Sequence, residues 1–520
     1  MNSRRHTLAL AGILALGLGL RLWGLGGEGL WIDEGHSVMV SRLGLGELFK
    51  ACAMDNHVPL YFLLVKGWSA LFGESEFALR VPAVIFGMLS IWATYLAGAM
   101  LFGREAGLVS SLLTALSVLL VHHSQEARMY GLLGLLALAS MYFFIGLLRG
   151  RGRAFDVGYV LSTGLLMYTH AYWAATILAQ NVVYATELVL WREQRRVSVK
   201  RWILLQVAVA ALYAPWVPIL RRQVAQVASE IPLLNVGGSM WLMAGYTLAV
   251  FSGYWMPLLA VMLPLAALSV LRWHKSEGAL EWRNLVGSVE GHRWTIYVAE
   301  LRSNYLAVVW LAAPMVLPVI MSLFLTPIYA WKAAIGSAPA LYVLAANGLT
   351  KLRSKWWRRA LLVVVVGLCV PPLWRYYVVV GKERWREVAQ YIETHASPGD
   401  LVLFNSGICR TWIYDYYATR TDLVLGSLPE PPTEGAFSPA AISARTVDDE
   451  TLKQLGPLVE GRARVWLILS HYGQGAFRIA EELSKAFHKA EFREYRPPSQ
   501  GGYTSVIYLY RFERKPGHVE

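Results

Sequence analysis

The strongest constraint on the fold is a series of long apolar segments separated by short clusters of lysine and arginine. A helix needs about 20 mostly apolar residues to cross a bilayer, and segments of this kind recur through the first 380 residues. A composition of 56% hydrophobic and 16% charged residues agrees with this pattern. We therefore expect a multi-pass α-helical membrane protein with about eleven transmembrane helices, centred on residues 7–25, 78–101, 107–122, 131–148, 156–174, 175–191, 202–219, 255–271, 305–324, 335–350 and 360–378.

The basic clusters predict the orientation of these segments, because cytoplasmic loops of membrane proteins carry an excess of lysine and arginine. With a cytoplasmic N-terminus, every second connection carries such a cluster, and the first outer loop and everything after about residue 380 lie outside. Arg221 and Arg222 are the exception, since they fall in an outer loop. The clusters contain Arg104, Arg149, Arg151, Arg153, Arg192, Arg195, Arg196, Lys200, Arg201, Arg272, Lys275, Lys351, Arg353, Lys355, Arg358 and Arg359.

The N-terminus resembles a secretory signal, with Arg4, Arg5 and His6 before an apolar run. No small-x-small cleavage site follows and Arg21 interrupts the run, so we interpret it as an uncleaved first span. The net charge of +13 is spread over loop clusters and forms no single basic stripe, which argues against nucleic acid as a partner. The three cysteines have neither CxxC nor Cys/His ligand spacing, so neither a disulfide framework nor a zinc motif is indicated.

The chain divides into two expected domains, a membrane domain over residues 1–379 and an extracytoplasmic α/β domain over residues 380–520. The second contains a helical run at 383–396, the strand-like runs LVLFN, RVWLILS and SVIYLYRF, and the helical run FRIAEELSKAF. The Pro-rich stretch 429–441 predicts a loop. Residues 27–76 form the first outer loop, and their short apolar helices are expected to be interfacial.

An adjacent carboxylate pair, Asp33 and Glu34 in GEGLWIDEGHSV, follows the first apolar span. Ionisable groups near a bilayer are costly, so they are usually kept for chemistry or transport. Neighbouring side chains on a helix or strand diverge, so we expect one carboxylate to face a site while the other orients it. The alternative is structural, with Asp33 as the N-cap of an interfacial helix.

Two further polar motifs lie on the same expected face. HHSQEARMYGL, residues 122–132, ends the third span and contains Glu126 and Arg128. Its simpler interpretation is a local ion pair that caps the next span, worth about 0–1 kcal/mol if exposed. DNHVPLYF, residues 55–62, places His57 before a helix that Pro59 would begin, and a hydrogen-bonded structural histidine is the simpler alternative there.

In chain order, LWIDEG, HVPLYF, SEFALRVPAVIFG, LFGREAGL, HSQEARMYGL and MYTHAYW resemble the GT-C glycosyltransferases of the protein O-mannosyltransferase and aminoarabinose transferase type. The resemblance is strong over residues 1–220 and mainly architectural beyond. It implies transfer of a sugar from a polyprenyl-phosphate carrier to an acceptor hydroxyl or phosphate, outside a bacterial or archaeal cell membrane. The implied partners are the lipid-linked donor, the bilayer and an acceptor glycan, lipid or protein.

The resemblance implies that Asp33 is the general base and that Glu34 completes the catalytic pair. Val58 replaces a proline of the relatives' motif, and Lys332 stands where relatives have an Arg-Tyr pair. A lysine supplies positive charge for a phosphate without the bidentate fork of arginine. The implied substrate-binding residues are His57, Tyr61, Arg80, Glu126, Arg128, Tyr130, His170 and Lys332.

The expected chemistry is a one-step displacement with inversion at the anomeric carbon, because no separate nucleophile is identifiable. The chain has neither a P-loop nor a Gly-rich dinucleotide turn, which agrees with a donor that is not a nucleotide. No cofactor is required by the sequence. A divalent cation held by Asp33, Glu126 or His57 is compatible with these residue types, but no ligand spacing demands one.

Two other function classes remain open at this stage. In a secondary transporter the carboxylates would relay protons or bind ions near the bilayer midplane; here they gather at one surface, and no internal repeat is visible. In a non-catalytic membrane scaffold, the outer α/β domain would bind a partner. The presence of both acidic motifs favours the glycosyltransferase.

Overall fold

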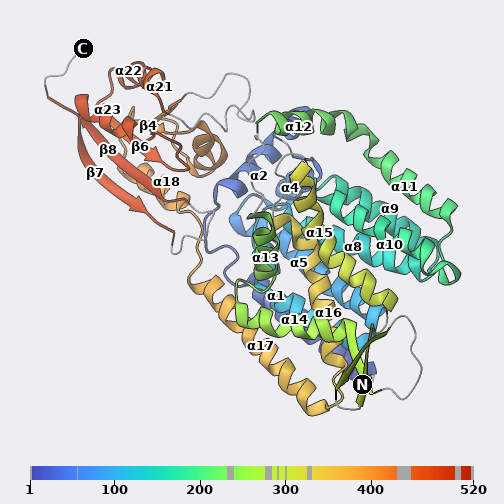
Figure 1. Ribbon diagram of the computed structural model, residues 1–520. Coiled ribbons are helices and arrows are strands. Elements are labelled where there is room, and N and C mark those ends of the chain that lie inside the picture. Colours follow the sequence, from blue (N-terminus) through green and yellow to red (C-terminus); the bar gives the residue numbers. More distant parts are fainter. Residues whose placement is uncertain are drawn as a thin grey trace. The chain divides into compact units, whose positions relative to one another are not determined.

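The computed structural model is mainly helical and divides into two compact units, each described here by itself (Figure 1). The first unit comprises Met1–Trp23 and Val81–Trp374, and the second comprises Gly24–Arg80 and Arg375–Glu520. Both units are therefore discontinuous in sequence. The structure describes residues 3–55, 57–230, 239–275, 284–289, 292–298, 301–324, 331–429, 447–497 and 505–516.

The first unit is a bundle of apolar helices, and every apolar segment expected from the sequence overlaps one of them. Its helices are α1 (Ser3–Leu22), most of α5 (Glu76–Phe102), α6 (Arg104–Leu116), α7 (Val118–His122), α8 (Tyr130–Leu148), α9 (Arg153–Met167), α10 (Trp173–Val189), η1 (Arg192–Gln194), α11 (Val199–Tyr213), η2 (Ala214–Trp216), α12 (Val217–Glu230), α13 (Ser239–Phe251), α14 (Met256–Val270), α15 (Leu301–Phe324), η3 (Trp331–Ser337), α16 (Ala338–Thr350) and most of α17 (Lys355–Val378).

Within the described residues, five helices are long and apolar enough to cross a membrane by themselves, or six if one bent pair counts as a single span. That pair, Gly245–Phe251 and Met256–Val270, is bent by 100°. The third expected span is broken between α6 and α7 at Ser117, whose hydroxyl accepts a hydrogen bond from the Leu120 amide. The structure thus shows several apolar helices, and the expected number of about eleven spans stays a prediction.

A buried polar network joins helices α14, α15 and α16. Hydrogen bonds and small residues of this kind hold helices together in an apolar surrounding. Ser269 donates to the Asn304 amide oxygen at 2.8 Å, and Asn347 donates to Ser269 at 2.9 Å. Gly348 lets α16 pack directly on α14, since a Cβ there would lie 1.7 Å from the Leu265 carbonyl oxygen. This network fixes the axial register of the three helices.

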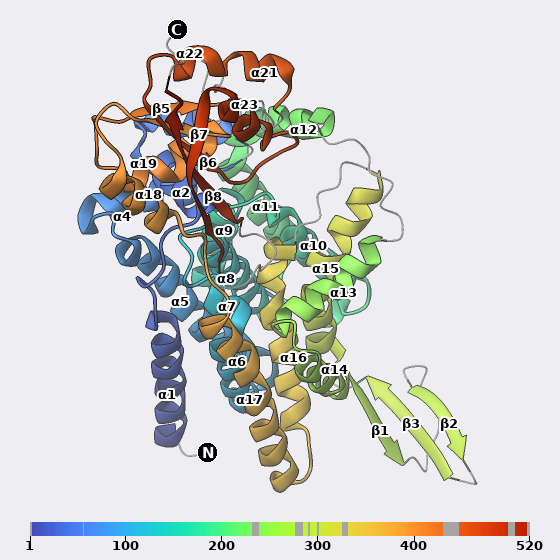
Figure 2. The same cartoon turned by 90° about the vertical axis from the view of Figure 1, so that its left-hand side faces the viewer.

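A three-stranded antiparallel sheet follows α14, in the order β1-β3-β2 (Figure 2). Its strands are β1 (Leu271–Lys275), β2 (Asn284–Val289) and β3 (His292–Val298). The sequence interpretation treated this region only as a basic connection. The signal that was overlooked is the pair of short runs NLVGSV and HRWTIYV separated by Glu-Gly, which is typical of a hairpin.

The second unit combines the first outer loop with the C-terminal part of the chain. The loop contributes α2 (Ile32–Arg42), α3 (Leu45–Met54) and α4 (Leu60–Phe72), and the last two match the short apolar helices expected there. The C-terminal part contains α18 (Trp385–His395), β4 (Leu401–Phe404), η4 (Cys409–Tyr414), α19 (Asp415–Tyr417), β5 (Val424–Ser427), α21 (Asp449–Lys453), α22 (Leu455–Val459), β6 (Arg464–Leu469), α23 (Arg478–Ala486), β7 (Phe487–Tyr495) and β8 (Ile507–Arg514).

The C-terminal strands form a five-stranded mixed sheet in the order β5-β4-β6-β8-β7. Strands β5, β4 and β6 run parallel, and β6, β8 and β7 pair in antiparallel fashion. All residues of β4 are buried, as expected for a central strand with a continuous apolar run. The short strand β5 and the charged strand β7 were not anticipated, and the Pro-rich stretch 429–441 lies, apart from Pro429, outside the described residues.

The expected domain division and the observed units agree near one boundary and differ at another. The boundary expected at residue 380 lies close to Arg375, where the second unit resumes. Residues 24–80, expected within the membrane domain, group instead with the C-terminal part. The Tyr417 hydroxyl accepts a hydrogen bond from the Leu30 amide at 2.6 Å, and Arg386 pairs with Glu76 at 2.7 Å. Such side-chain pairing between distant segments leaves no periodic signal in the sequence.

Gly35 of α2 provides a test of this packing. A Cβ at Gly35 would lie 2.2 Å from the Trp412 carbonyl oxygen of η4 and 2.9 Å from Ile413 Cδ1. Gly35→Ala must push α2 away from η4, at a cost of about 1–3 kcal/mol, so the midpoint of thermal unfolding of the purified protein should fall.

The matched control is Gly67→Ala in α4, where a Cβ meets nothing within 4 Å. Alanine is favoured over glycine in a helix interior by up to about 1 kcal/mol, so this variant should unfold at the wild-type temperature or above. An unchanged midpoint for Gly35→Ala would contradict the close approach of α2 and η4.

Candidate functional site

Asp33 lies in the first turn of α2, where a negative charge is favoured by the helix dipole. Trp31, and not Asp33, occupies the N-cap position, so the structural alternative considered for Asp33 is not what the structure shows. The free amide groups at the start of α2 are instead satisfied by other carboxylates. The Ile32 amide donates to Glu383 at 3.3 Å, and the Trp31 amide donates to Glu34 at 3.4 Å. Asp33 itself is half-buried.

Glu34 is fully buried and is held by two cations. Arg80 binds both of its oxygens in bidentate fashion, with Nε to Oε1 at 2.9 Å and Nη2 to Oε2 at 2.8 Å. Lys382 adds a third contact to Oε2 at 2.9 Å. The adjacent carboxylates therefore have different environments, as the divergence of neighbouring side chains predicts. Glu34 is committed to internal ion pairs, and Asp33 is not part of that cluster.

Arg80 uses all five of its N–H groups inside the protein. Besides Glu34, the guanidinium donates to the carbonyl oxygens of Leu25, Glu28 and Gly29 at 2.8–2.9 Å. A guanidinium has five donors, so none remains for a ligand in this arrangement. Arg80 ties residues 25–34 together. The substrate-binding role that the resemblance implies for it stays a prediction.

Lys382 and Glu383 are important residues of this region that sequence reasoning missed. Glu383 is buried and accepts hydrogen bonds from the Trp385 indole at 2.8 Å and from the Ser505 amide at 3.2 Å, and it pairs with His471 at 2.7 Å. Its contact with α2 joins the start of that helix to the C-terminal sheet region. The only signal in the sequence was the run GKERW, in which a lysine and a glutamate follow the last apolar segment.

His57 lies just before α4, and Tyr61 lies in the first turn of that helix. The Tyr61 side chain is buried, with its ring 6.0 Å from that of Phe62. His57 contacts Asp55, the C-cap residue of α3, and Asp55 also contacts His36 of α2. Burial alone would raise the pKa of the Asp55 carboxyl, but its interactions with His36 and His57 hold that pKa well below its usual range. The expected histidine is therefore part of a three-residue cluster.

The second acidic motif lies in the first unit and gathers several of the expected residues. Glu126 is buried and contacts His123 Nδ1 at 2.9 Å and His122 Nε2 at 3.8 Å. The ring of Tyr130 lies 5.1 Å from that of His123 and 6.1 Å from that of His170. The structure thus brings Glu126, Tyr130 and His170 into one neighbourhood.

Arg21 and Arg128 are further buried cations of the first unit. Arg21 of α1 donates to the Ser124 hydroxyl at 3.1 Å and to the Gly17 and Ala115 carbonyls. Gln125 donates back to the Arg21 carbonyl at 2.9 Å. A buried charge in an apolar surrounding needs such partners, so the arginine that interrupts the first apolar run holds the acidic motif in place.

The described residues contain two groups whose ligand atoms are close enough to hold a metal ion, namely His36, Asp55 and His57 in the second unit and His122, His123 and Glu126 in the first. The sequence assigned no metal and named Asp33, Glu126 and His57 only as residues compatible with a divalent cation. Asp33 belongs to neither group. Lys332 lies in η3, and its side chain falls outside the described part of the chain.

Comparison with known proteins agrees with this architecture. Residues 56–219, which are 164 of the 520 residues, match the family described as dolichyl-phosphate-mannose-protein mannosyltransferase. Apo ArnT from Cupriavidus metallidurans is 15% identical, with 97% of this chain and 98% of ArnT covered and a TM-score of 0.60. The chain has the GT-C fold. The resemblance stated from the sequence is confirmed to that extent.

Two further solved structures support the same fold. ArnT from Cupriavidus metallidurans bound to undecaprenyl phosphate is 14% identical, with 96% of this chain and 97% of ArnT covered and a TM-score of 0.59. The Archaeoglobus fulgidus oligosaccharyltransferase in complex with Zn and sulfate is 12% identical, with coverage of 96% and 74% and a TM-score of 0.55. No match is found among curated protein sequences.

The buried cluster around Glu34 generates a stability prediction. Glu34→Gln leaves Arg80 and Lys382 without a negative partner in a buried site, and breaking a buried pair in this way costs about 3–5 kcal/mol. We expect a large loss of folded protein on size-exclusion chromatography and a lower thermal midpoint.

The comparison variant is Glu74→Gln, which removes the partner of Arg42 in a solvent-exposed pair with N–O distance 2.6 Å. Exposed pairs contribute about 0–1 kcal/mol, so this variant should behave like wild type. Equal stability of the two variants would rule out a structural role for the Glu34 cluster.

Proposed function

We propose that this protein is an integral-membrane glycosyltransferase that moves a sugar from a polyprenyl-phosphate carrier to an acceptor hydroxyl or phosphate on the extracytoplasmic face. The GT-C fold, shared with an ArnT structure that contains undecaprenyl phosphate, supports this proposal. The mannosyltransferase family match over residues 56–219 supports it independently. Among the described residues, five helices are long and apolar enough to cross a bilayer, and they would supply the lipid-facing surface that such a carrier requires.

The observation that carries the proposal is that the two neighbouring carboxylates differ in burial and in ion pairing. Glu34 is buried and fully paired, whereas Asp33, one residue earlier on α2, is half-buried and lies outside that cluster. In this proposal Glu34 positions the helix and Asp33 performs the chemistry. A general base must reach the proton it removes, which a buried and paired carboxylate does not.

The proposed reaction is a single displacement with inversion. The acceptor hydroxyl oxygen attacks the anomeric carbon, its proton passes to Asp33, and the bond between that carbon and the phosphate oxygen breaks. The polyprenyl phosphate leaves with the bonding electron pair, so positive charge must stabilise its developing negative charge. Arg128 and Lys332 are the proposed sources. With a phosphate acceptor, which carries no proton at the attacking oxygen, Asp33 would serve to orient the attack.

The remaining expected residues take binding roles in this proposal. Glu126, Tyr130 and His170 share one neighbourhood in the first unit. In the second unit, His57 lies just before α4 and Tyr61 lies in its first turn. The proposed partners are the lipid-linked donor, the bilayer and an acceptor glycan, lipid or protein, with no nucleic acid. The N-terminus would be cytoplasmic and the C-terminal α/β part extracytoplasmic, in a bacterial or archaeal cell membrane.

Asp33→Asn tests the base assignment. In proteoliposomes supplied with a panel of undecaprenyl-phosphate-linked hexoses, pentoses and aminoarabinose, together with envelope extract as acceptor, wild-type protein should consume one donor class, as followed by mass spectrometry. Loss of a general base lowers the rate by about 10²–10⁴-fold, so the variant should show that loss with unchanged thermal stability.

Glu47→Gln is the control, because Glu47 is an exposed carboxylate in the first turn of α3 and the substitution is chemically the same. It should transfer sugar at the wild-type rate. Wild-type turnover by folded Asp33→Asn would refute Asp33 as the base, whereas absence of donor consumption by wild-type protein across the panel would refute the proposed function.

A further inference from the structure

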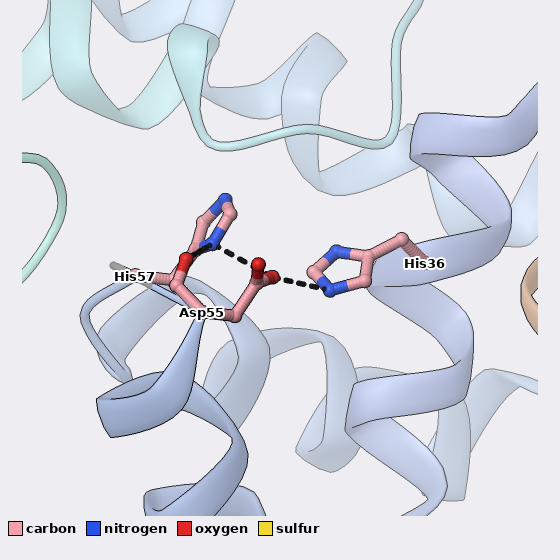
Figure 3. Close-up of side chains that lie close together, drawn as sticks. All are labelled: His36, Asp55 and His57. Atoms are coloured by element: carbon pink, nitrogen blue, oxygen red, sulfur yellow. Dashed lines mark hydrogen bonds and ion pairs between the residues drawn. The ribbon is translucent and has the colours of Figure 1, made fainter. Parts of the chain in front are cut away.

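Three side chains from separate parts of the first outer loop converge on one point. His36 comes from α2, Asp55 ends α3, and His57 lies just before α4 (Figure 3). The Asp55 carboxylate lies between the two imidazoles, with His36 Nε2 at 2.9 Å from Oδ2 and His57 Nδ1 at 3.1 Å from the same oxygen. The cluster contains none of the carboxylates Asp33, Glu34 and Glu126 that suggested the reaction.

The chemistry of the cluster matches that of a transition-metal site. Two imidazole nitrogens and one carboxylate oxygen are ligands for zinc and related divalent ions, with bonds of about 2.0–2.2 Å. Tetrahedral geometry then places neighbouring ligand atoms about 3.4 Å apart. The observed spacings are slightly shorter, and all three ligand atoms lie within 4.8 Å of one another. Small rotations of the side chains would open the required space.

The contacts at Asp55 Oδ2 are short but poorly directed. Its Oδ2 atom is buried and has no donor with hydrogen-bond geometry, although two imidazole nitrogens lie within 3.1 Å. A buried carboxylate oxygen without a well-directed donor is costly. His57 Nδ1 also lies 2.7 Å from the Asp55 backbone carbonyl oxygen. A metal ion at Nδ1 would replace this contact and would draw the Asp55 carboxylate and the two imidazoles together as its ligands.

The surroundings restrict how these side chains move. The Trp412 ring lies 4.4 Å from the His36 ring, and Phe62 meets His36 and His57 edge-on at 5.7 and 5.6 Å. Side-chain exposure rises from 3% for His36 to 10% for Asp55 and 23% for His57. The cluster is therefore walled on one side and open to solvent on the other. Three protein ligands with an open position are typical of a zinc site that also holds water.

We propose that His36, Asp55 and His57 bind a divalent transition-metal ion of the zinc type, with a remaining coordination position for water. The ion would join α2 to the segment between α3 and α4. His36 lies one helical turn after Asp33, so both occupy the same face of α2. Metal binding would thereby fix the helix that carries the proposed base, without taking part in the transfer itself.

Zinc content of the full-length protein tests the proposal without any sugar donor. Purified protein in detergent is stripped with EDTA, incubated with Zn²⁺, desalted and measured by mass spectrometry of the metal. Relative to wild type, His36→Gln, Asp55→Asn and His57→Gln should each lose one equivalent of zinc. The loss of zinc affinity should be larger than the loss of about 10–100-fold that follows removal of a group hydrogen-bonded to a metal ligand.

His488→Gln is the matched control, because His488 of β7 is an exposed histidine that also lies near a carboxylate, 3.6 Å from Glu513. It should retain the full zinc content. Wild-type zinc content in folded His57→Gln, the least buried of the three positions, would overturn the proposal.

A ligand exchange gives a positive signature that a folding defect cannot produce. His36→Cys replaces an imidazole with a thiolate ligand, so Co²⁺ added to this variant should give a sulfur-to-cobalt charge-transfer band in the near ultraviolet that wild-type protein lacks. Failure of the band to appear in Co²⁺-treated His36→Cys would count against residue 36 as a ligand.

Discussion

The arrangement of the second unit depends on a buried carboxylate with two cations around it. Removing Glu34, Arg80 and Lys382 from water costs several kcal/mol for each ion, and the structure offsets this cost with bidentate geometry and complete use of the guanidinium donors. The pairs connect the first outer loop, the start of α5 and the segment after α17. Because α2 is fixed at its first turn, the direction of the neighbouring Asp33 is fixed with it.

Buried polar groups in the first unit are likewise satisfied by partners inside the protein. Arg21 satisfies its charge with a hydroxyl and backbone carbonyls, and Asn304 and Asn347 are joined through Ser269. In an apolar surrounding no water is available to hydrogen-bond such groups, so neighbouring helices must supply their partners. The acidic motif at Glu126 is thereby attached to α1 through Arg21, Ser124 and Gln125.

Local sequence patterns predicted a large part of this fold. The apolar segments coincide with helices, and the short helices α3 and α4 and the strands β4, β6 and β8 lie where periodicity places them, because these signals arise from neighbouring residues. The pairings at the candidate site were not predictable in this way. Lys382 and Glu34 are in contact although 348 positions separate them in the sequence. His36 becomes a candidate ligand only because Asp55 and His57 lie beside it in the structure. Adjacent carboxylates predicted a division of roles, but not which cations would enforce it.

The discontinuous second unit has a consequence for biosynthesis. Residues 24–80 leave the ribosome early, yet the lysine that neutralises Glu34 and the glutamate that receives the first amide of α2 are encoded more than three hundred codons later. At about 5–20 residues per second, roughly 17–70 s separate the two events. During that interval Glu34 and Arg80 can pair with each other, but their contacts with Lys382 and Glu383 are missing. The loop therefore reaches its final arrangement only after the chain has been translated past residue 383.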